Sequence, residues 1–252
     1  MARIDDLLAA ALKTLPPKPP DTASREDKRR YSELVSEKAA QAVAEELRRR
    51  GLKTARPAPP GVLDSSGAER RMAGGIGAKK VDITWATEES GLLLGISIKS
   101  INFKSIVKKG GMEVGGNFQK NLTNRRGDML MEAVTLHRRF PYAVLGGLFF
   151  LDAGAAKDDT SRRRSTFLNA HARLQLFTGR DDPAGRDEQF EKMYLLLLEA
   201  SPTACTIRTF EVGNPHDEVP LETVIDELVG RVAFRNPDFY EYREGRLASL
   251  PR

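Results

Sequence analysis

The sequence predicts an α/β domain, because helical and strand patterns alternate along it. Apolar residues recur at helical spacing over residues 25–50, and apolar and polar side chains alternate in two segments between residues 81 and 101. A polar-faced helical pattern at residues 117–140 then leads into an apolar strand. With 252 residues, of which 40% are hydrophobic and 30% charged, the chain can bury a sizeable core.

Two helices are expected near the N-terminus. Residues 4–15 form a short apolar pattern, and the proline-rich run at residues 16–20 ends it and stiffens the connection that follows. We therefore expect residues 1–24 to form an arm with a Pro-rich linker. Ser24 and Asp27 have the spacing of a capping box, so the next helix is expected to begin there.

A hairpin is expected after the Pro- and Gly-rich loop at residues 56–77. In its second strand, Ser97 and Lys99 share the face opposite to the aliphatic one. Antiparallel pairing around the short turn places Asp82, in the first strand, opposite these residues. A carboxylate and an ammonium group would then project from neighbouring strands into one small volume.

The remaining elements follow from the same patterns. The segments expected after the hairpin are a helix at residues 117–140, a buried strand at 142–151, a charged loop at 157–165, a helix near 186–199, a strand at 203–212 and a helix near 220–233.

Composition restricts the class of protein. Forty Lys and Arg residues against 35 Asp and Glu give a formal net charge of +5, which favours polyanionic partners without identifying one. Cys205 is the only cysteine, so an intramolecular disulfide and a zinc site built from two thiolates of this chain are excluded. The longest apolar stretch is too short to span a bilayer, and no signal peptide is recognisable. We expect a cytoplasmic protein that does not enter a membrane.

The pairing of Asp82 with Lys99 has a chemical meaning. A carboxylate holds a hard divalent cation through oxygen, and a neighbouring lysine can orient or help to deprotonate a water molecule that attacks a phosphodiester. The alternative is a cross-strand salt bridge at the surface, which contributes less than about 1 kcal/mol.

These residues resemble the PD-(D/E)xK nuclease superfamily, which includes most type II restriction endonucleases. The resemblance covers about residues 30–152. It lies in the hairpin Lys80-Val81-Asp82-Ile83-Thr84-Trp85 to Gly95-Ile96-Ser97-Ile98-Lys99, in the order of the surrounding elements, and in the helical segment Asn121-Leu122-Thr123-Asn124-Arg125-Arg126-Gly127-Asp128. It implies a restriction-endonuclease-like core, with a central mixed β-sheet flanked by helices. Residues 25–252 would then be a single nuclease domain with a C-terminal α/β extension at residues 153–252.

Two positions depart from the pattern of this superfamily. Val81 stands where the family has proline, and Ser97 stands where it has Asp or Glu, two residues before Lys99. The second departure leaves a metal ion one carboxylate short.

Three glutamates are candidates for the missing acid. Glu113 has thirteen residues between it and Lys99, as in a restriction-enzyme subgroup with a migrated glutamate, although the glycines around it favour a flexible loop. Glu37 is the second candidate, because many members of the superfamily place a carboxylate of the first helix beside the metal. It could equally be a solvated helical residue. Glu132 is the third candidate.

The resemblance implies a magnesium-dependent DNA endonuclease of the restriction or defence type, with Mn²⁺ as a possible substitute for Mg²⁺. The candidate catalytic residues are Asp82, Ser97, Lys99, Glu37 and Glu113. Asp82, the Ile98 carbonyl and Glu37 would bind the metal, and Lys99 would position the water. Cleavage would leave a 5′ phosphate and a 3′ hydroxyl, and a homodimer would cut both strands.

Candidate DNA contacts gather where the helix at residues 117–140 begins. Asn, Gln and Arg read base edges or hold phosphate groups, whereas Asn at such a place can also serve as a helix cap. The candidates are Asn117, Gln119, Asn121, Asn124, Arg125 and Arg126, with Lys104, Lys108, Lys109 and Arg162 to Arg164 as weaker candidates for backbone contacts.

Other sites are disfavoured. The glycine-rich segment at residues 74–80 lacks the Gly-Lys-Ser/Thr ending of a phosphate-binding loop and leads into a strand, so no nucleotide cofactor is expected. His137, His171 and His216 are too widely separated to suggest a metal site. The alternative hypothesis, motivated by Ser97, is a DNA-binding module that is catalytically degenerate or that needs a partner chain to complete its acidic site.

Overall fold

The computed structural model describes residues 3–62, 71–75, 77–109, 112–201 and 204–251. Its helices are α1 (Ile4–Lys13), α2 (Arg25–Arg49), α3 (Leu122–His137), α4 (Thr166–Leu174) and α5 (Leu221–Arg235), with the 3-10 helices η2 (Phe118–Asn121), η3 (Ala153–Ala156) and η4 (Gln175–Phe177). Its strands are β1 (Arg71–Ala73), β2 (Ala78–Lys80), β3 (Ile83–Thr87), β4 (Gly91–Ile101), β5 (Ile106–Lys109), β6 (Met112–Gly115), β7 (Val144–Asp152), β8 (Lys192–Ala200), β9 (Cys205–Glu211), β10 (Tyr240–Arg243) and β11 (Arg246–Ser249).

The centre of the fold is a five-stranded sheet with the order β3-β4-β7-β8-β9. β4, β7 and β8 run parallel to one another, whereas the outer strands β3 and β9 are antiparallel to their neighbours. The sheet is therefore mixed, and the predicted α/β class with a central mixed sheet flanked by helices is confirmed. The hairpins β1–β2, β5–β6 and β10–β11 form separate two-stranded sheets.

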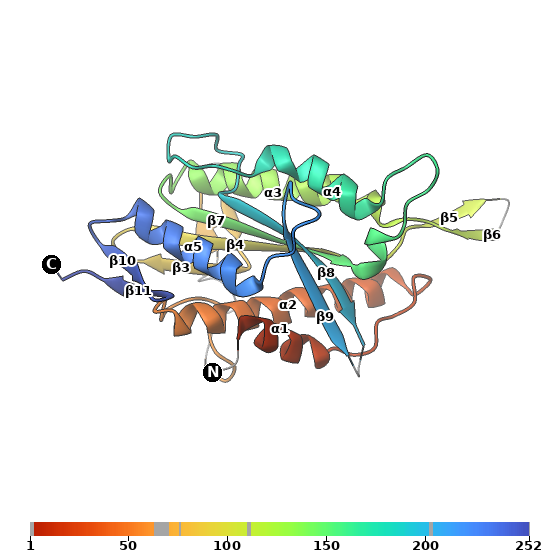
Figure 1. Ribbon diagram of the computed structural model, residues 1–252, viewed down its shortest axis with the longest axis horizontal. Helices are drawn as coiled ribbons and strands as arrows, with labels where there is room; N and C mark the ends of the chain where they lie inside the picture. Colours follow the sequence, from red (N-terminus) through yellow and green to blue (C-terminus); the bar gives the residue numbers. More distant parts are fainter. Residues whose placement is uncertain (1–2, 63–70, 76, 110–111, 202–203, 252) are drawn as a thin grey trace.

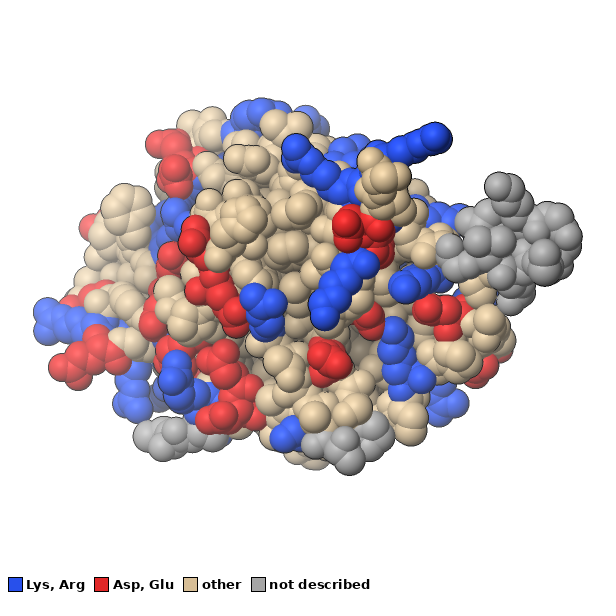
Figure 2. All heavy atoms as spheres, turned by 45° about the vertical axis from the view of Figure 1, so that its right-hand side comes forward, with Lys and Arg blue, Asp and Glu red and all other residues tan. Residues whose placement is uncertain are grey.

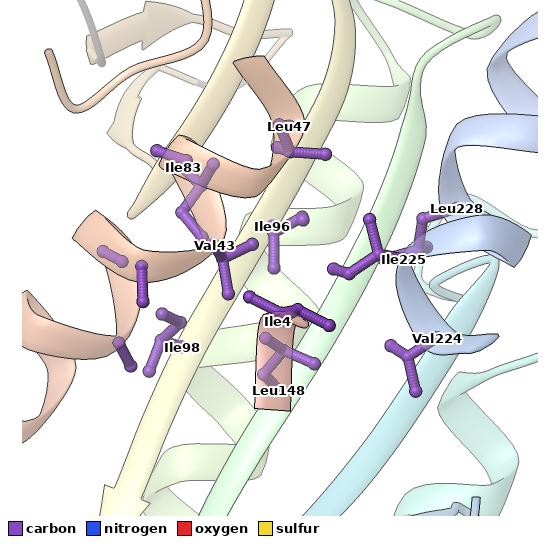
Figure 3. Packing of buried hydrophobic residues seen from close by; sticks show 14 of the residues in the cluster. Ile4, Val43, Leu47, Ile83, Ile96, Ile98, Leu148, Val224, Ile225 and Leu228 are labelled. Atoms are coloured by element: carbon purple, nitrogen blue, oxygen red, sulfur yellow. The ribbon is translucent and has the colours of Figure 1, made fainter. Parts of the chain in front are cut away.

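Helices cover both faces of this sheet (Figure 1). α1, α2 and α5 bury their apolar side chains in a core cluster with one face, while α3 and α4 form a second core cluster with the other. Figure 3 shows the first of these clusters, in which Ile4, Val43 and Ile225 of the three helices meet Leu148 of the sheet. The two helical layers determine which side chains of each strand face which helix.

α2 forms where the sequence predicts it. The Ser24 hydroxyl accepts a hydrogen bond from the Asp27 amide at 3.1 Å and donates one to the Asp27 carboxylate at 2.7 Å. This interaction satisfies an amide that the first helical turn leaves without a partner, which explains why the helix begins there.

The N-terminal segment packs more closely than an arm would. Ile4, Leu8 and Leu12 of α1 are at most 1% exposed and belong to the same core cluster as α2 and α5. Their spacing of four residues places them on one side of the helix. The expected arm is thus corrected, since α1 is part of the helical layer.

β8 corrects the expectation of a helix near residues 186–199. Tyr194, Leu196 and Leu198 belong to one core cluster, whereas the alternate residues Met193 and Leu195 belong to the other. A strand that is buried on both faces has a continuous apolar run without a period of two, so the pattern did not distinguish it from a buried helix.

The C-terminal segment is integral to the sheet. β8 and β9 lie beyond residue 152 and supply two of its five strands, so residues 153–252 do not form an extension outside the core. α4, which was not predicted, crosses between β7 and β8 on the same side as α3. Its N-terminal cap is Ser165, whose hydroxyl accepts from the Leu168 amide at 3.3 Å. The predicted helix at residues 117–140 is divided into η2 and a shorter α3.

Candidate active site

The β3–β4 pairing places Asp82 beside the middle of β4. Ile83 pairs with Ile96, and Asp82 directly precedes this pair. One oxygen of Asp82, Oδ2, accepts a hydrogen bond from the Ile98 amide at 2.7 Å. The predicted position of Asp82 across from residues 97–99 is therefore confirmed. The N–H and C=O groups of one residue in an antiparallel pair face the same neighbour, so the Ile98 carbonyl is directed toward the edge where Asp82 lies.

Three further side chains meet Asp82 on this side of β4. The Lys99 ammonium group lies 3.9 Å from Asp82 Oδ2 and 3.2 Å from Glu132 Oε2 of α3, and it donates to the Ser97 hydroxyl at 2.8 Å. The Ser97 hydroxyl in turn donates to Glu132 Oε2 at 3.1 Å. We call Asp82, Ser97, Lys99 and Glu132 the candidate catalytic cluster, or catalytic cluster for short.

Glu132 reaches the cluster because α3 lies close to the sheet. Ser97 of β4 pairs with Gly147 of β7, and a Cβ atom at Gly147 would lie 2.9 Å from the Met129 side chain of α3. The missing side chain therefore leaves room for the end of the Met129 side chain at this level of the sheet. Glu132 follows Met129 by three residues, so both lie on the side of α3 that faces the sheet.

Glu132 is buried, and its burial shifts the pKa of the carboxyl group. The residue is 5% exposed, and its Oε1 atom has no hydrogen-bond partner among the residues that the structure describes. Burial raises the pKa of Glu132 above its ordinary value, the ammonium group of Lys99 opposes this, and the negative charge of Asp82 adds to it. The Lys99 and Asp82 side chains are 16% and 32% exposed, so the cluster opens toward solvent on the Asp82 side.

The donor set fits a magnesium ion. Within the described parts of the chain, no group of three or more His, Cys, Asp or Glu residues is arranged to hold a metal. Mg²⁺ does not require such a group, because it usually keeps several water ligands and binds through one or two carboxylates. Asp82 and Glu132 are two carboxylates, and the buried Oε1 atom of Glu132 is an oxygen whose bonding capacity is unused.

The other two candidates for the missing acid, Glu37 and Glu113, are not seen to contact the cluster in the described structure. Glu37 is exposed on α2, which packs against the opposite face of the sheet, and no hydrogen bond or ion pair in the described structure links it to the cluster. The expectation that Glu37 joins the metal site is therefore corrected. The Glu113 side chain lies outside the described part of the structure.

The sequence ranks Glu132 behind Glu37 and Glu113, because its contact with Ser97 is not local. The hydrogen bond from Ser97 joins residues that are 35 positions apart, and it depends on how far α3 is rotated about its axis. In the sequence, Glu132 ends the polar side of this helix, whereas in the structure it is buried against the sheet.

The predicted DNA-contacting residues lie along η2 and the first turns of α3. Asn117 acts as a cap, since its Oδ1 atom accepts from the Gln119 amide at 2.9 Å. Asn121 and Asn124 are exposed. The Arg125 guanidinium lies 3.9 Å from the Asp128 carboxylate, and that of Arg126 lies over the Phe177 ring. The side chains of the weaker candidates Lys108 and Lys109 are outside the described residues.

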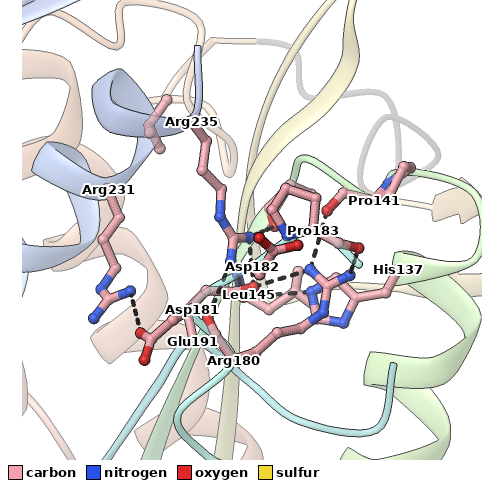
Figure 4. Close-up of polar contacts among 12 residues, drawn as sticks. His137, Pro141, Leu145, Arg180, Asp181, Asp182, Pro183, Glu191, Arg231 and Arg235 are labelled. Atoms are coloured by element: carbon pink, nitrogen blue, oxygen red, sulfur yellow. Dashed lines mark hydrogen bonds and ion pairs between the residues drawn. The ribbon is translucent and has the colours of Figure 1, made fainter. Parts of the chain in front are cut away.

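The C-terminal end of α3 is fixed by a buried ionic network (Figure 4). The carboxylate of Glu191 is fully buried and accepts from Arg235 at 2.5 Å, from Arg180 at 3.3 Å and from the Leu145 amide at 2.5 Å. His137, the last residue of α3, lies 3.3 Å from the same carboxylate. The network joins α3 to α5 and to the starts of β7 and β8, five residues beyond Glu132.

The sites that the sequence disfavours have structural roles. The Gly75 amide donates to the Thr135 carbonyl at 2.8 Å, and a Cβ atom at Gly74 would lie 2.3 Å from that oxygen, so these glycines allow the backbone to pack on α3. His171 accepts from the Gly213 amide at 3.1 Å, and burial together with the nearby His216 lowers the pKa of His171 to about 4.

Comparison with known proteins supplies no relative. The chain matches no family model, no curated protein and no solved structure. Within the described residues, no helix has both the length and the apolar character needed to cross a membrane. The geometry of the catalytic cluster is therefore the basis on which a function can be inferred.

Proposed function

We propose that this chain is a magnesium-dependent DNA endonuclease with a restriction-endonuclease-like core, and that the catalytic cluster is its active site. The observation that carries the proposal is the buried Glu132 carboxylate beside Lys99. It supplies a second acid where the sequence motif has Ser97, and its Oε1 atom is left without a partner.

Each residue of the cluster has a proposed task. Asp82 and Glu132 would hold the cation, for which Mn²⁺ can substitute. A bound Mg²⁺ ion supplies Lewis-acid stabilisation of the charge that develops on the phosphate. Lys99 would orient the attacking water with its ammonium group. Ser97 accepts from Lys99 and donates to Glu132, so it keeps both side chains in place. Ser97 is a positioning residue in this scheme.

The remaining parts of the proposal come from the resemblance. In-line attack would leave a 5′ phosphate and a 3′ hydroxyl, and a homodimer would bring two catalytic clusters to two strands. A role in restriction or defence follows the same analogy.

The test is cleavage of supercoiled plasmid by the purified protein, with Mg²⁺ or with EDTA. We expect Mg²⁺-dependent cutting that is lost in Asp82→Asn, Lys99→Met and Glu132→Gln. Glu37→Gln is the matched control, because it removes one carboxylate that lies on the opposite side of the sheet, and it should cut like the wild type. Full activity in Glu132→Gln would refute the assignment of the second acid.

A second measurement does not depend on cutting. Calorimetric titration with Mn²⁺ alone should show binding to the wild type and to Glu37→Gln, and binding at least about tenfold weaker in Glu132→Gln. If no divalent metal supports cutting while DNA is still bound, the catalytically degenerate or partner-dependent module replaces the proposed enzyme.

A further inference from the structure

The positive charge of this chain is concentrated in two segments. Residues 117–130 and 153–177 together contain eight Lys and Arg residues and three Asp residues, a net charge of +5. This value equals the formal net charge of the whole chain, so all other residues together are neutral. A mild overall bias thus becomes a strong local one.

Contacts between side chains join the two segments into one surface. The buried Asp158 carboxylate accepts from the Phe118 amide of η2 at 3.2 Å and from the Thr166 amide of α4 at 2.6 Å. The Arg173 guanidinium of α4 donates to the Thr123 hydroxyl of α3 at 3.4 Å. The loop before α4 is therefore fastened beside the start of α3.

We define the α3–α4 basic surface by its solvent-accessible cations, which are Lys120, Arg125, Arg126, Lys157, Arg162, Arg164 and Arg173. In the view of Figure 2, Lys and Arg side chains gather along the upper part of the molecule, where α3 and α4 lie in Figure 1.

Most of this charge is not neutralised within the chain. Among the described residues, no ion pair engages Arg162, Arg164 or Arg173, and Arg163 is the member of the arginine run that pairs with Asp158, at 3.7 Å. An open depression of about 590 Å³ is lined by the three consecutive arginines, by the hydroxyl groups of Thr160 and Ser161 and by one acid, Asp159. Unpaired guanidinium groups beside hydroxyl groups match the oxygens of a phosphodiester.

The surface lies close to the catalytic cluster. Arg125 precedes Glu132 by seven residues, which places both on the same side of α3 and about 10 Å apart along its axis. Nucleic acid that contacts the first turns of α3 would thus lie within a few nucleotides of Glu132, given a rise of about 3.4 Å per nucleotide in duplex DNA.

We propose that the α3–α4 basic surface binds the phosphate backbone of duplex DNA and that the loop carrying Arg162 and Arg164 is a principal contact. The inference rests on the proposed function and deepens it by locating substrate binding outside the catalytic cluster. α4 buries Phe167, Ala170 and Leu174 against the sheet, so its apolar face is covered, and a single exposed side chain, Leu176 of η4, does not make an apolar face that could enter a lipid surface. Exposed Asn121 and Asn124 lie among the cations and add groups that can bind DNA.

The test compares two triple variants in binding a fluorescent duplex oligonucleotide with EDTA present, at several salt concentrations. Arg162→Ala, Arg164→Ala and Arg173→Ala together should weaken binding about tenfold or more near 100 mM salt and reduce the slope of log K against log [salt] by about 2 to 3. The matched control removes three exposed cations near the β10–β11 hairpin, through Lys53→Ala, Arg243→Ala and Arg246→Ala, and should leave both quantities nearly unchanged.

The outcomes separate this inference from the proposed function. Unchanged affinity and slope in the first variant would overturn the inference, even for a protein that cuts DNA. Weakened binding in a protein that never cuts would support the surface and refute the enzyme. Binding to anionic phosphatidylserine vesicles in place of the duplex would also overturn it. Circular dichroism of both variants verifies folding, which we expect to persist because the substituted side chains are at the surface.

Discussion

Replacement of Glu191 by glutamine should strongly destabilise the fold. The carboxylate is fully buried and accepts hydrogen bonds from the guanidinium groups of Arg180 and Arg235. Glutamine keeps the shape and removes the negative charge, so two buried cations would lose their counter-charge. Removal of one partner of a buried ion pair typically costs about 3–5 kcal/mol. For a chain of this size, that loss corresponds to a Tm about 10 °C lower.

The measurement is thermal and urea unfolding of both proteins at neutral pH. The control is Glu188→Gln. Glu188 lies three residues before Glu191, and its partly exposed carboxylate pairs with exposed Arg186. We expect this control to change stability by less than about 0.5 kcal/mol. A loss below about 1 kcal/mol in Glu191→Gln would refute the view that this network holds the end of α3.

The pH dependence supplies a second check on Glu191. Burial by itself would raise the pKa of Glu191, but the adjacent His137 imidazole, the charge of Arg235 and the hydrogen bond from the Leu145 amide together hold it below its ordinary value. A carboxyl group with a lowered pKa stabilises the fold at neutral pH, and this contribution is lost as the pH falls through that lowered pKa. The difference between the wild type and Glu191→Gln should therefore shrink in acid.

Three further predictions concern α3 and α1. Glu132→Gln should be as stable as the wild type in acid and more stable at mildly alkaline pH. The raised pKa of Glu132 means that its ionisation lowers the stability of the wild type as the pH rises from the ordinary value to the raised one. If the Tm of the variant differs from that of the wild type by the same amount at both pH values, this prediction is contradicted. Gly147→Ala should force the ends of the Met129 and Met193 side chains to repack, since its Cβ atom would lie 2.9 Å from the Met129 methyl group, with a stability loss of about 1 kcal/mol; Met129→Ala in the same chain should remove this crowding, and an unchanged crowding cost would contradict it. Leu8→Ala should cost about 2–5 kcal/mol in urea unfolding if α1 belongs to the core, whereas an arm would tolerate it.

The sequence determined the local parts of this structure. Capping at Ser24, helical periodicity in α2 and the alternation in β3 and β4 depend on neighbouring residues, and all three are present. The position of Asp82 across from residues 97–99 also followed from the sequence, because a short turn leaves few possible registers. The strand β8 was mistaken for a helix, since a strand buried on both faces has no distinguishing period.

The tertiary structure decided which acid completes the site. Spacing and helix position rank Glu113 and Glu37 before Glu132 in the sequence, and the correct choice requires knowing which helix covers the face of β4 that carries Ser97 and Lys99. α3 covers that face, and Gly147 leaves room there for the end of the Met129 side chain. The same packing joins two separate basic segments into the α3–α4 basic surface. Contacts between residues far apart in the chain depend on the rotation and approach of whole elements, which local patterns do not encode.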